Sequence, residues 1–374
     1  MIGDLPMKVL FLHGAIKNSG DFLIAHRSQK LIKQIVPSCE IDALWEGESE
    51  SVIKKHLSGI SGIVFGGGPF FTNHIYPRDI PLVSDLSELN LPMINVGGGW
   101  YGADNRYDSV VNYEIDDTSL ELLRRIESSA GCLSCRDWYT VNMLKKKGLM
   151  AEMHGCPAWY DIETVPISEL RTTGVINKIC ISDPASTINY RMAVEVIGLL
   201  RKLYPSAEIV FVFHRGTWEK EEGRRGEKRR AIIEPMLTKN KIEYVDIARG
   251  YSGFSVYDDC DLHVGFRVHA HIYNLSKRNR TILLEEDGRG AGVNQALGLN
   301  SIHVYDDRMQ FKPVALRRIK NKISPSLNGY LLEEIINCID RNEYNNWIEY
   351  ELAFKRMQFY YDQMCCHISK IKEW

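Results

Sequence analysis

The chain alternates short apolar runs with longer stretches in which apolar residues recur at helical spacing. The first such pair is KVLFLHG at residues 8–14 and DFLIAHRSQKLIKQIV at 21–36. The compact run predicts a buried strand, and the three- to four-residue recurrence predicts an amphipathic helix. GIVFGGG at 62–68 and MINVGGG at 93–99 repeat the strand, and each is expected to stop at its three glycines. Glycine allows a sharp turn and a close approach by a ligand.

A second series of strands follows the loop-rich stretch at 162–174. Its strand-like runs are KICISDPAS at 178–186, EIVFVFHRG at 208–216, IEYVDI at 242–247, DLHVGF at 261–266, TILLEED at 281–287 and SIHVYDD at 301–307, with helical stretches between them. This alternation predicts α/β architecture, in which helices cover both faces of a parallel sheet. We therefore expect two Rossmann-like domains, at 7–165 and 174–342, facing a cleft. An aromatic-rich amphipathic stretch at 343–374 predicts a C-terminal helical tail.

Composition narrows the class of protein. The formal net charge of the 374 residues is −2, which argues against binding of nucleic acid through a basic surface. We find no apolar segment typical of a signal peptide or a transmembrane span, and the nine cysteines are an odd number, so we expect reduced thiols in the cytoplasm. Cys132 and Cys135 form a lone CxxC without a second pair or a nearby histidine pair. The sequence predicts no metal site.

The stretch GFRVHAHIYNLSKRNRTILLEEDGRG, residues 265–290, holds many ionisable groups between two apolar runs. Arg267 falls at the carboxyl end of a predicted strand, where open parallel sheets bind ligands. Arginine clamps phosphate or carboxylate groups, and a neighbouring histidine moves protons near neutral pH. If the helix has already begun, His269 and His271 point in different directions and cannot share one role. The KRNR run at 277–280 is most simply the polar end of that helix.

Other candidates lie at similar strand ends. Asp21 either caps the first helix or acts at the site, and Ser134 and Arg136 follow a strand and open a helix, where an anion is favoured. The acids that end the predicted strand at 281–287 either bind ligand hydroxyls or cap the next helix. The remaining candidate ligand-binding residues are Gly67, Gly68, Gly98, Gly99, His214, Arg215, Glu286 and Asp287.

Taken in order, GDFLI, IVFGGGP, INVGGG, LSCRD, GCPA, FRVHAHI and TILLEED resemble the polysaccharide pyruvyl transferase family. The resemblance implies a two-domain GT-B-like fold and transfer of the carboxyvinyl unit of phosphoenolpyruvate to a sugar as a pyruvate ketal. The family's Arg-x-His pattern falls on Arg267 and His269. Its Ser-x-Arg turn falls on Ser134 and Arg136. No cofactor is implied beyond the donor substrate.

Three functions follow from these patterns. In a pyruvyl transferase of cell-surface exopolysaccharide biosynthesis, Arg267 and Arg136 would hold the donor's anions, His269 would donate the proton, and Asp21 or Asp287 would position the acceptor hydroxyl. In a GT-B glycosyltransferase, Glu286 and Asp287 would hold a nucleotide sugar, with Arg267 on the diphosphate. The third alternative is a non-catalytic binding protein whose tail helix is its interaction surface.

The partner expected for an enzyme of this kind is a sugar or lipid-linked oligosaccharide. The basic stretch 224–230 and the tail helix are candidates for peripheral attachment at the inner membrane face. No pattern specifies the oligomeric state.

Overall fold

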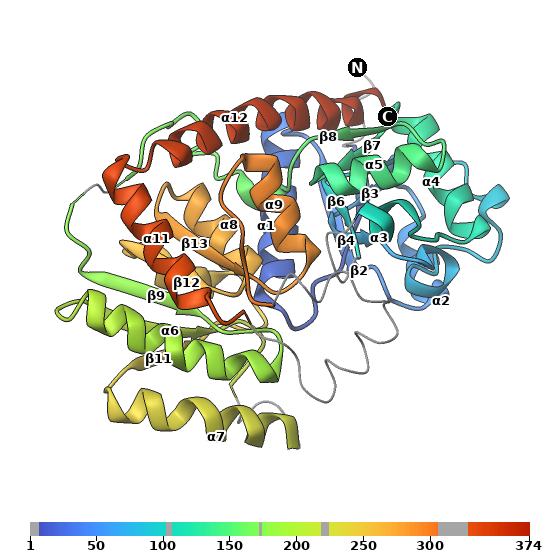
Figure 1. Ribbon diagram of the computed structural model, residues 1–374. Coiled ribbons are helices and arrows are strands. Elements are labelled where there is room, and N and C mark those ends of the chain that lie inside the picture. Colours follow the sequence, from blue (N-terminus) through green and yellow to red (C-terminus); the bar gives the residue numbers. More distant parts are fainter. Residues whose placement is uncertain (1–6, 102–106, 172–173, 218–223, 306–327) are drawn as a thin grey trace. The chain divides into compact units, whose positions relative to one another are not determined.

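The computed structural model describes residues 7–101, 107–171, 174–217, 224–305 and 328–374 (Figure 1). Its contacts divide the chain into two units. Unit 1 comprises Met1–Pro166 and Lys355–Trp374, and unit 2 comprises Ile167–Phe354. The end of the chain therefore belongs with unit 1, although it follows unit 2 in sequence.

Unit 1 contains two four-stranded sheets whose paired strands are parallel. The first has the order β2-β1-β3-β5, formed by β1 (Lys8–His13), β2 (Glu40–Trp45), β3 (Gly62–Phe65) and β5 (Met93–Asn95). The second has the order β4-β6-β7-β8, formed by β4 (Gly68–Phe71), β6 (Gly98–Trp100), β7 (Leu133–Cys135) and β8 (Ala151–Met153). The middle of β1 is fully buried, as its unbroken apolar run predicts.

The glycine runs join these two sheets. Only two residues separate β3 from β4, and two separate β5 from β6. The prediction that the strands stop at the glycines is confirmed, since β3 ends at Phe65 and β5 ends at Asn95. What the sequence did not predict is that the chain bends there and continues as a strand of the second sheet. Gly67 and Gly97 carry the bend at φ values of 78° and 64°, which side chains other than glycine rarely adopt.

Five α-helices are described in unit 1 before the tail. They are α1 (Ser19–Ile35), α2 (Glu50–His56), α3 (Tyr107–Val111), α4 (Asp117–Ala130) and α5 (Trp138–Lys146). Asp116 caps α4 by accepting from Ser119 N, and Asp137 caps α5 by accepting from Thr140 N. The remaining turns of unit 1 are Ile75–Asp79, Leu86–Glu88 and Pro157–Trp159.

Unit 2 is built on one six-stranded sheet with the order β11-β10-β9-β12-β13-β14. The strands are β9 (Lys178–Ser182), β10 (Glu208–Phe213), β11 (Glu243–Asp246), β12 (Leu262–Gly265), β13 (Arg280–Glu285) and β14 (Ile302–His303), all paired in parallel. Counted from β9, the order is 3-2-1-4-5-6, that of a doubly wound Rossmann sheet. Of the strand predicted at 301–307, the structure shows β14 at Ile302–His303. The last two residues of that prediction belong to 306–327, which lie outside the described residues.

The helices of unit 2 follow its strands in the expected alternation. They are α6 (Tyr190–Leu203), α7 (Arg224–Lys239), α8 (Val268–Ser276), α9 (Gly288–Leu297) and α11 (Leu331–Tyr344), with short turns at Thr187–Asn189 and Ser252–Tyr257. The basic stretch 224–230 forms the start of α7. The α/β class predicted from the sequence is confirmed in both units.

The predicted helical tail is confirmed as α12 (Ile348–Ser369) followed by a short turn at Lys370–Glu373 (Figure 1). Phe354 is buried in the part of α12 that belongs to unit 2, and Met357, Met364 and Ile368 are buried in the part that belongs to unit 1. In the part of the chain that the structure describes, no helix is long and apolar enough to cross a membrane.

The KRNR run departs from its prediction as a polar helix end. Arg278 and Arg280 are buried, with exposed fractions of 1% and 2%. Arg278 donates to the Ile167 carbonyl and lies over the Phe354 ring, while Arg280 donates to the Gly174 carbonyl. A planar guanidinium can pack on an aromatic face while it donates to carbonyls. Both buried arginines therefore bind other segments of unit 2.

Candidate functional site

The order of strands in unit 2 reverses between β9 and β12, the position at which open parallel sheets bind ligands. Asp183 directly follows β9, and Arg267 follows β12. Arg267 Nε lies 2.7 Å from Asp183 Oδ1, and Arg267 Nη2 lies 2.7 Å from Oδ2. A buried two-point ion pair therefore lies at the predicted ligand edge of unit 2.

Asp183 is also bound by two other groups. Its carboxylate accepts from the Tyr190 hydroxyl at 3.2 Å and from His214 N at 3.1 Å. Burial lowers the pKa of Arg267, but the charge of Asp183 outweighs it, and the pKa lies above its ordinary value. Arg267 as an anion clamp stays a prediction, with two of its nitrogens already bound inside the protein.

The two histidines of α8 occupy different environments. His271 is buried, its Nδ1 lies 2.9 Å from Thr281 Oγ1, and burial lowers its pKa to about 3. It is therefore neutral near pH 7 and has no imidazolium proton to give. His269 lies on the first turn of α8 and is partly exposed. Of the two, His269 stays the candidate proton donor.

A buried polar network explains part of the charge density at 265–290. His263 joins Thr281 Oγ1 at 2.8 Å and Ser182 Oγ at 2.9 Å, and Arg267 N donates to the same Ser182 Oγ. Burial holds the pKa of His263 well below its ordinary value. The network ties β9, β12 and β13 together beneath the strand ends.

The acids after β13 bind protein groups. Glu286 accepts from Ala185 N at 2.6 Å, Ser186 N at 3.1 Å and Asn189 Nδ2 at 2.6 Å. Asp287 caps α9 and pairs with Arg289 at 2.5 Å. Of the two alternatives left open by the sequence, the structure shows capping for Asp287. Binding of ligand hydroxyls by either acid stays a prediction.

His214 and Arg215 follow β10. His214 is buried, and its Nε2 lies 2.8 Å from the Tyr257 hydroxyl. Burial, together with the charges of Arg267 and Arg215, lowers its pKa well below the ordinary value. His214 thus contacts the Asp183–Arg267 pair, since its backbone N–H donates to Asp183. Arg215 is half-buried.

In unit 1 the predicted glycines lie against protein atoms. A Cβ at Gly67 would clash with the Val96 carbonyl, and a Cβ at Gly99 would clash with the guanidinium of Arg136. Gly68 and Gly98 begin β4 and β6. Close packing of the chain on itself therefore explains Gly67 and Gly99 without a ligand.

Ser134 and Arg136 are both buried but differ in their partners. Ser134 Oγ accepts from Gly97 N at 2.9 Å, and Ser134 N donates to Asn95 Oδ1 at 3.0 Å, which locks β5 to β7. The carboxylate of Asp137 comes no nearer to Arg136 Nε than 3.8 Å. Among the residues that the structure describes, Arg136 Nη2 is buried with no hydrogen-bond partner.

Asp137 compensates the charge of Arg136 poorly. Its carboxylate caps α5, and burial raises its pKa even though Arg136 opposes the shift. A buried cation with an unfilled donor is costly unless an anion joins it. Arg136 is therefore the strongest candidate anion contact in unit 1.

Asp21 lies in the first turn of α1, where Asn18 rather than Asp21 occupies the N-cap and donates to Asp21 Oδ2 at 3.1 Å. Glu46 follows β2 at the same edge of the sheet. Burial, with Asp21 and Asp79 nearby, raises the pKa of Glu46 to about 7. A carboxyl that titrates near neutral pH suits general acid–base work.

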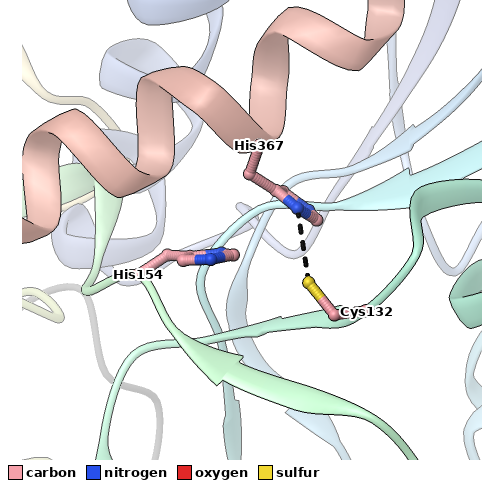
Figure 2. Close-up of side chains that lie close together, drawn as sticks. All are labelled: Cys132, His154 and His367. Carbon is pink, nitrogen blue, oxygen red and sulfur yellow. Dashed lines mark hydrogen bonds between the residues drawn. The ribbon is translucent and has the colours of Figure 1, made fainter.

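A third cluster in unit 1 joins residues far apart in sequence. Cys132, His154 and His367 are each no more than 4% exposed, and their ligand atoms lie within 4.8 Å of one another. Figure 2 shows His367 reaching from a helix toward Cys132, whose Sγ lies 3.7 Å from His367 Nδ1. The His154 ring lies beside that of His367, with 4.7 Å between centroids.

Sequence reasoning missed Asp183, Glu46 and this cluster. Asp183 and Glu46 carry the same signal that selected Arg267, an ionisable residue directly after an apolar strand. The cluster carries no such signal, since His367 is separated from Cys132 by 235 positions. No local spacing rule could have found it.

A family model described as polysaccharide pyruvyl transferase matches residues 18–273. No curated protein sequence matches the chain. The family match covers more than half of the chain and includes Arg136 of unit 1 and Asp183 and Arg267 of unit 2, but ends before Glu286 and Asp287.

Solved structures align with most of the chain at low identity. A protein named as a UDP-N-acetylglucosamine 2-epimerase from Listeria monocytogenes aligns with a TM-score of 0.52 at 10% identity, covering 95% of this chain and 91% of its own. MnaA of S. aureus, solved with UDP, aligns with a TM-score of 0.49 at 11% identity, covering 91% of this chain and 97% of its own. HepE of Anabaena, solved with UDP and glucose, aligns with a TM-score of 0.47 at 10% identity, covering 98% of each chain. The fold is GT-B-like.

Proposed function

Since the chain belongs to the polysaccharide pyruvyl transferase family and is therefore a transferase, we propose that it moves the pyruvyl unit of phosphoenolpyruvate onto a sugar of a cell-surface glycan precursor. The family match is the basis of this proposal. The geometry adds a reason to expect an anionic donor.

The observation that carries the proposal is the state of Arg136. Its guanidinium is buried, Asp137 lies 3.8 Å away and is committed to capping α5, and Nη2 has no described partner. A phosphate or carboxylate of phosphoenolpyruvate would satisfy this donor and balance the charge. We therefore assign Arg136 to donor binding.

The chemistry needs one proton and two acceptor hydroxyls. The methylene carbon of phosphoenolpyruvate gains a proton, and the first sugar hydroxyl bonds to the neighbouring carbon. A second hydroxyl of the same sugar then displaces phosphate, which leaves a pyruvate ketal and inorganic phosphate. His269, on the family's Arg-x-His pattern, is the proposed proton donor. Arg267, already neutralised by Asp183, is proposed to orient a ligand rather than to supply net charge.

The acceptor hydroxyl needs a group that can take its proton. In unit 1, Asp21 keeps its proposed role, and Glu46 adds a carboxyl with a pKa of about 7. A base with that pKa is half ionised at neutral pH and can both accept and return a proton. We propose that Glu46 acts in this step.

A nucleotide-sugar donor is the alternative that the same experiment tests. The acids assigned to it, Glu286 and Asp287, already bind backbone amides, Asn189 and Arg289. They have less capacity left for the hydroxyls of a ribose or sugar.

The first test is the melting temperature of the purified protein with phosphoenolpyruvate and, separately, with a panel of nucleotides and nucleotide sugars. Saturating phosphoenolpyruvate at about 100 times its dissociation constant adds roughly 2.7 kcal/mol and raises the melting temperature by several degrees. Arg136→Met should abolish this rise. The matched control is Arg125→Met, which removes an arginine of α4 that pairs with Glu121 and should leave the rise intact.

Turnover is then followed as phosphate release and as the mass of the ketal product across a panel of sugars with two neighbouring free hydroxyls. A rise in melting temperature with a nucleotide and none with phosphoenolpyruvate would overturn the proposed donor.

A further inference from the structure

The Cys132, His154 and His367 side chains come from three separate elements of unit 1. Cys132 precedes β7, His154 follows β8, and His367 lies near the end of α12. All three are buried, and their ligand atoms fall within 4.8 Å of one another. A zinc ion with bonds of about 2.3 Å to sulfur and about 2.0 Å to nitrogen needs ligand atoms separated by roughly 3–4 Å. The 3.7 Å between Cys132 Sγ and His367 Nδ1 meets that requirement.

The hydrogen bonds of His367 fix which nitrogen is available. Its Nε2 lies 3.1 Å from the Asn95 carbonyl oxygen, which can only accept. Nε2 therefore carries the hydrogen, and the lone pair of Nδ1 points to the Cys132 thiol. Metal-binding histidines commonly have this arrangement, in which the remote N–H donates to a carbonyl or carboxylate.

His154 shows the same feature. Its Nε2 lies 3.3 Å from Glu152 Oε2, and its Nδ1 is buried with no hydrogen-bond partner among the described residues. Leaving a buried polar atom unpaired destabilises the folded state, and a cluster without a ligand would have to tolerate that cost. The thiol, two imidazoles and one unsatisfied nitrogen in one buried cluster thus favour a bound ligand.

We propose that Cys132 Sγ, His367 Nδ1 and one imidazole nitrogen of His154 bind a divalent transition metal of the zinc class. Thiolate and imidazole are the ligands that zinc prefers, and hard ions such as magnesium avoid them. Glu152, whose carboxylate lies 3.3 Å from His154 Nε2, orients that ring from outside the ligand set.

The metal has a structural role in unit 1. It connects the end of α12 to the segments that precede β7 and follow β8. Asn95 links this site to Ser134, because its carbonyl accepts from His367 and its side chain accepts from Ser134 N. Ser134 lies two positions before Arg136, so the metal braces the strand that carries the proposed donor contact. The metal site itself stands on geometry and does not depend on the proposed function.

The test uses the full chain, purified without a histidine tag. Metal analysis is expected to give about one zinc per chain, as for a single mononuclear site. After removal of metal by a chelator, added Co²⁺ should give visible tetrahedral bands and a thiolate-to-cobalt charge-transfer band. The charge-transfer band reports a cysteine ligand directly and needs no variant to fold.

Matched variants locate the ligand. Cys132→Ser and His367→Gln should lose the metal and the band, while Cys135→Ser, which changes the other buried cysteine of the CxxC, should keep both. Glu152→Gln should weaken metal affinity by about 10–100-fold. Circular dichroism shows whether each variant is folded.

Wild-type protein that gives no thiolate band with Co²⁺ would overturn the site. Retention of the metal and the band in Cys132→Ser would do the same. Either result leaves phosphoenolpyruvate binding untouched, so the two proposals fail separately.

Discussion

Two arginines at strand ends, Arg136 in unit 1 and Arg267 in unit 2, have the same burial but different electrostatic environments. Their exposed fractions are 5% and 6%. Arg267 binds Asp183 through two nitrogens at 2.7 Å, whereas Arg136 has its nearest carboxylate, that of Asp137, at 3.8 Å. The position at a strand end brings a cation to the ligand edge, but the nearest acid decides whether the cation is compensated.

The same contrast extends to the acids. Asp183 of unit 2 is bound by Arg267, Tyr190 and His214, while Glu46 of unit 1 lies near two other acids, and its pKa rises to about 7. Unit 1 therefore has uncompensated charge at its strand ends, and unit 2 has compensated charge. Uncompensated groups are the ones available to a ligand.

The largest expected effect comes from breaking the pair in unit 2. Asp183→Asn leaves a buried guanidinium without its countercharge and should lower the free energy of unfolding by about 3–5 kcal/mol in urea denaturation. Adding Arg267→Met should recover most of the loss, because no charge is then left unpaired. Asp259→Asn, which breaks the exposed pair with Lys178, is the control and should cost no more than about 1 kcal/mol. Equal losses of unfolding free energy in Asp183→Asn and Asp259→Asn would contradict the comparison.

The matching change in unit 1 should affect binding rather than stability. Arg136→Met removes a cation that Asp137 compensates poorly, so the stability of the variant should stay within about 1 kcal/mol of wild type. Affinity for phosphoenolpyruvate should fall by about 10–100-fold, as expected for a charge-assisted hydrogen bond of roughly 1.5–3 kcal/mol. Calorimetric titration measures this. A large loss of stability with unchanged affinity would make Arg136 a structural residue like Arg267.

Glu46 gives the comparison a pH dependence. Its folded pKa of about 7 lies above the ordinary 4.5, so between these values the folded protein holds a proton that the unfolded chain has lost. Stability from this group is present below about pH 4.5 and is lost as the pH rises toward 7. Relative to wild type, Glu46→Gln should therefore gain about 3 kcal/mol of stability across this window. The measurement is the free energy of unfolding as a function of pH, with Glu48→Gln, a nearby change, as the control. If wild type, Glu46→Gln and Glu48→Gln gave parallel curves, the raised pKa of Glu46 would be refuted.

The smallest effect should come from Asp137→Asn. Asparagine caps a helix about as well as aspartate, so α5 should keep its cap while the charge beside Arg136 is removed. Affinity for phosphoenolpyruvate should then rise by a few-fold, on the order of 0.5–1 kcal/mol, in the same titration. A fall in affinity would mean that Asp137 orients Arg136 and that its charge is needed.

Much of the fold was predictable because it depends on local periodicity. The runs predicted as strands at 8–14, 178–186 and 261–266 contain β1, β9 and β12, and the following helices and the helical tail are where the sequence places them. The strands end at the glycine runs as predicted, but the second sheet that begins there was not predicted, since a bend into a second sheet and a simple strand end have the same local composition. The KRNR run was misread because charge alone does not reveal the aromatic ring and carbonyls that receive Arg278 and Arg280.

The candidate sites divide in the same way. By itself the sequence determined the α/β class, the family resemblance and the strand ends at which Arg136, Arg267, His269 and Asp21 would lie. Only the tertiary structure decided that Asp183 compensates Arg267, that Arg136 keeps an unfilled donor, and that His367 meets Cys132 and His154. Strand and helix patterns are set by neighbouring residues, whereas charge compensation and metal ligation depend on which distant side chains the fold brings within a few ångströms.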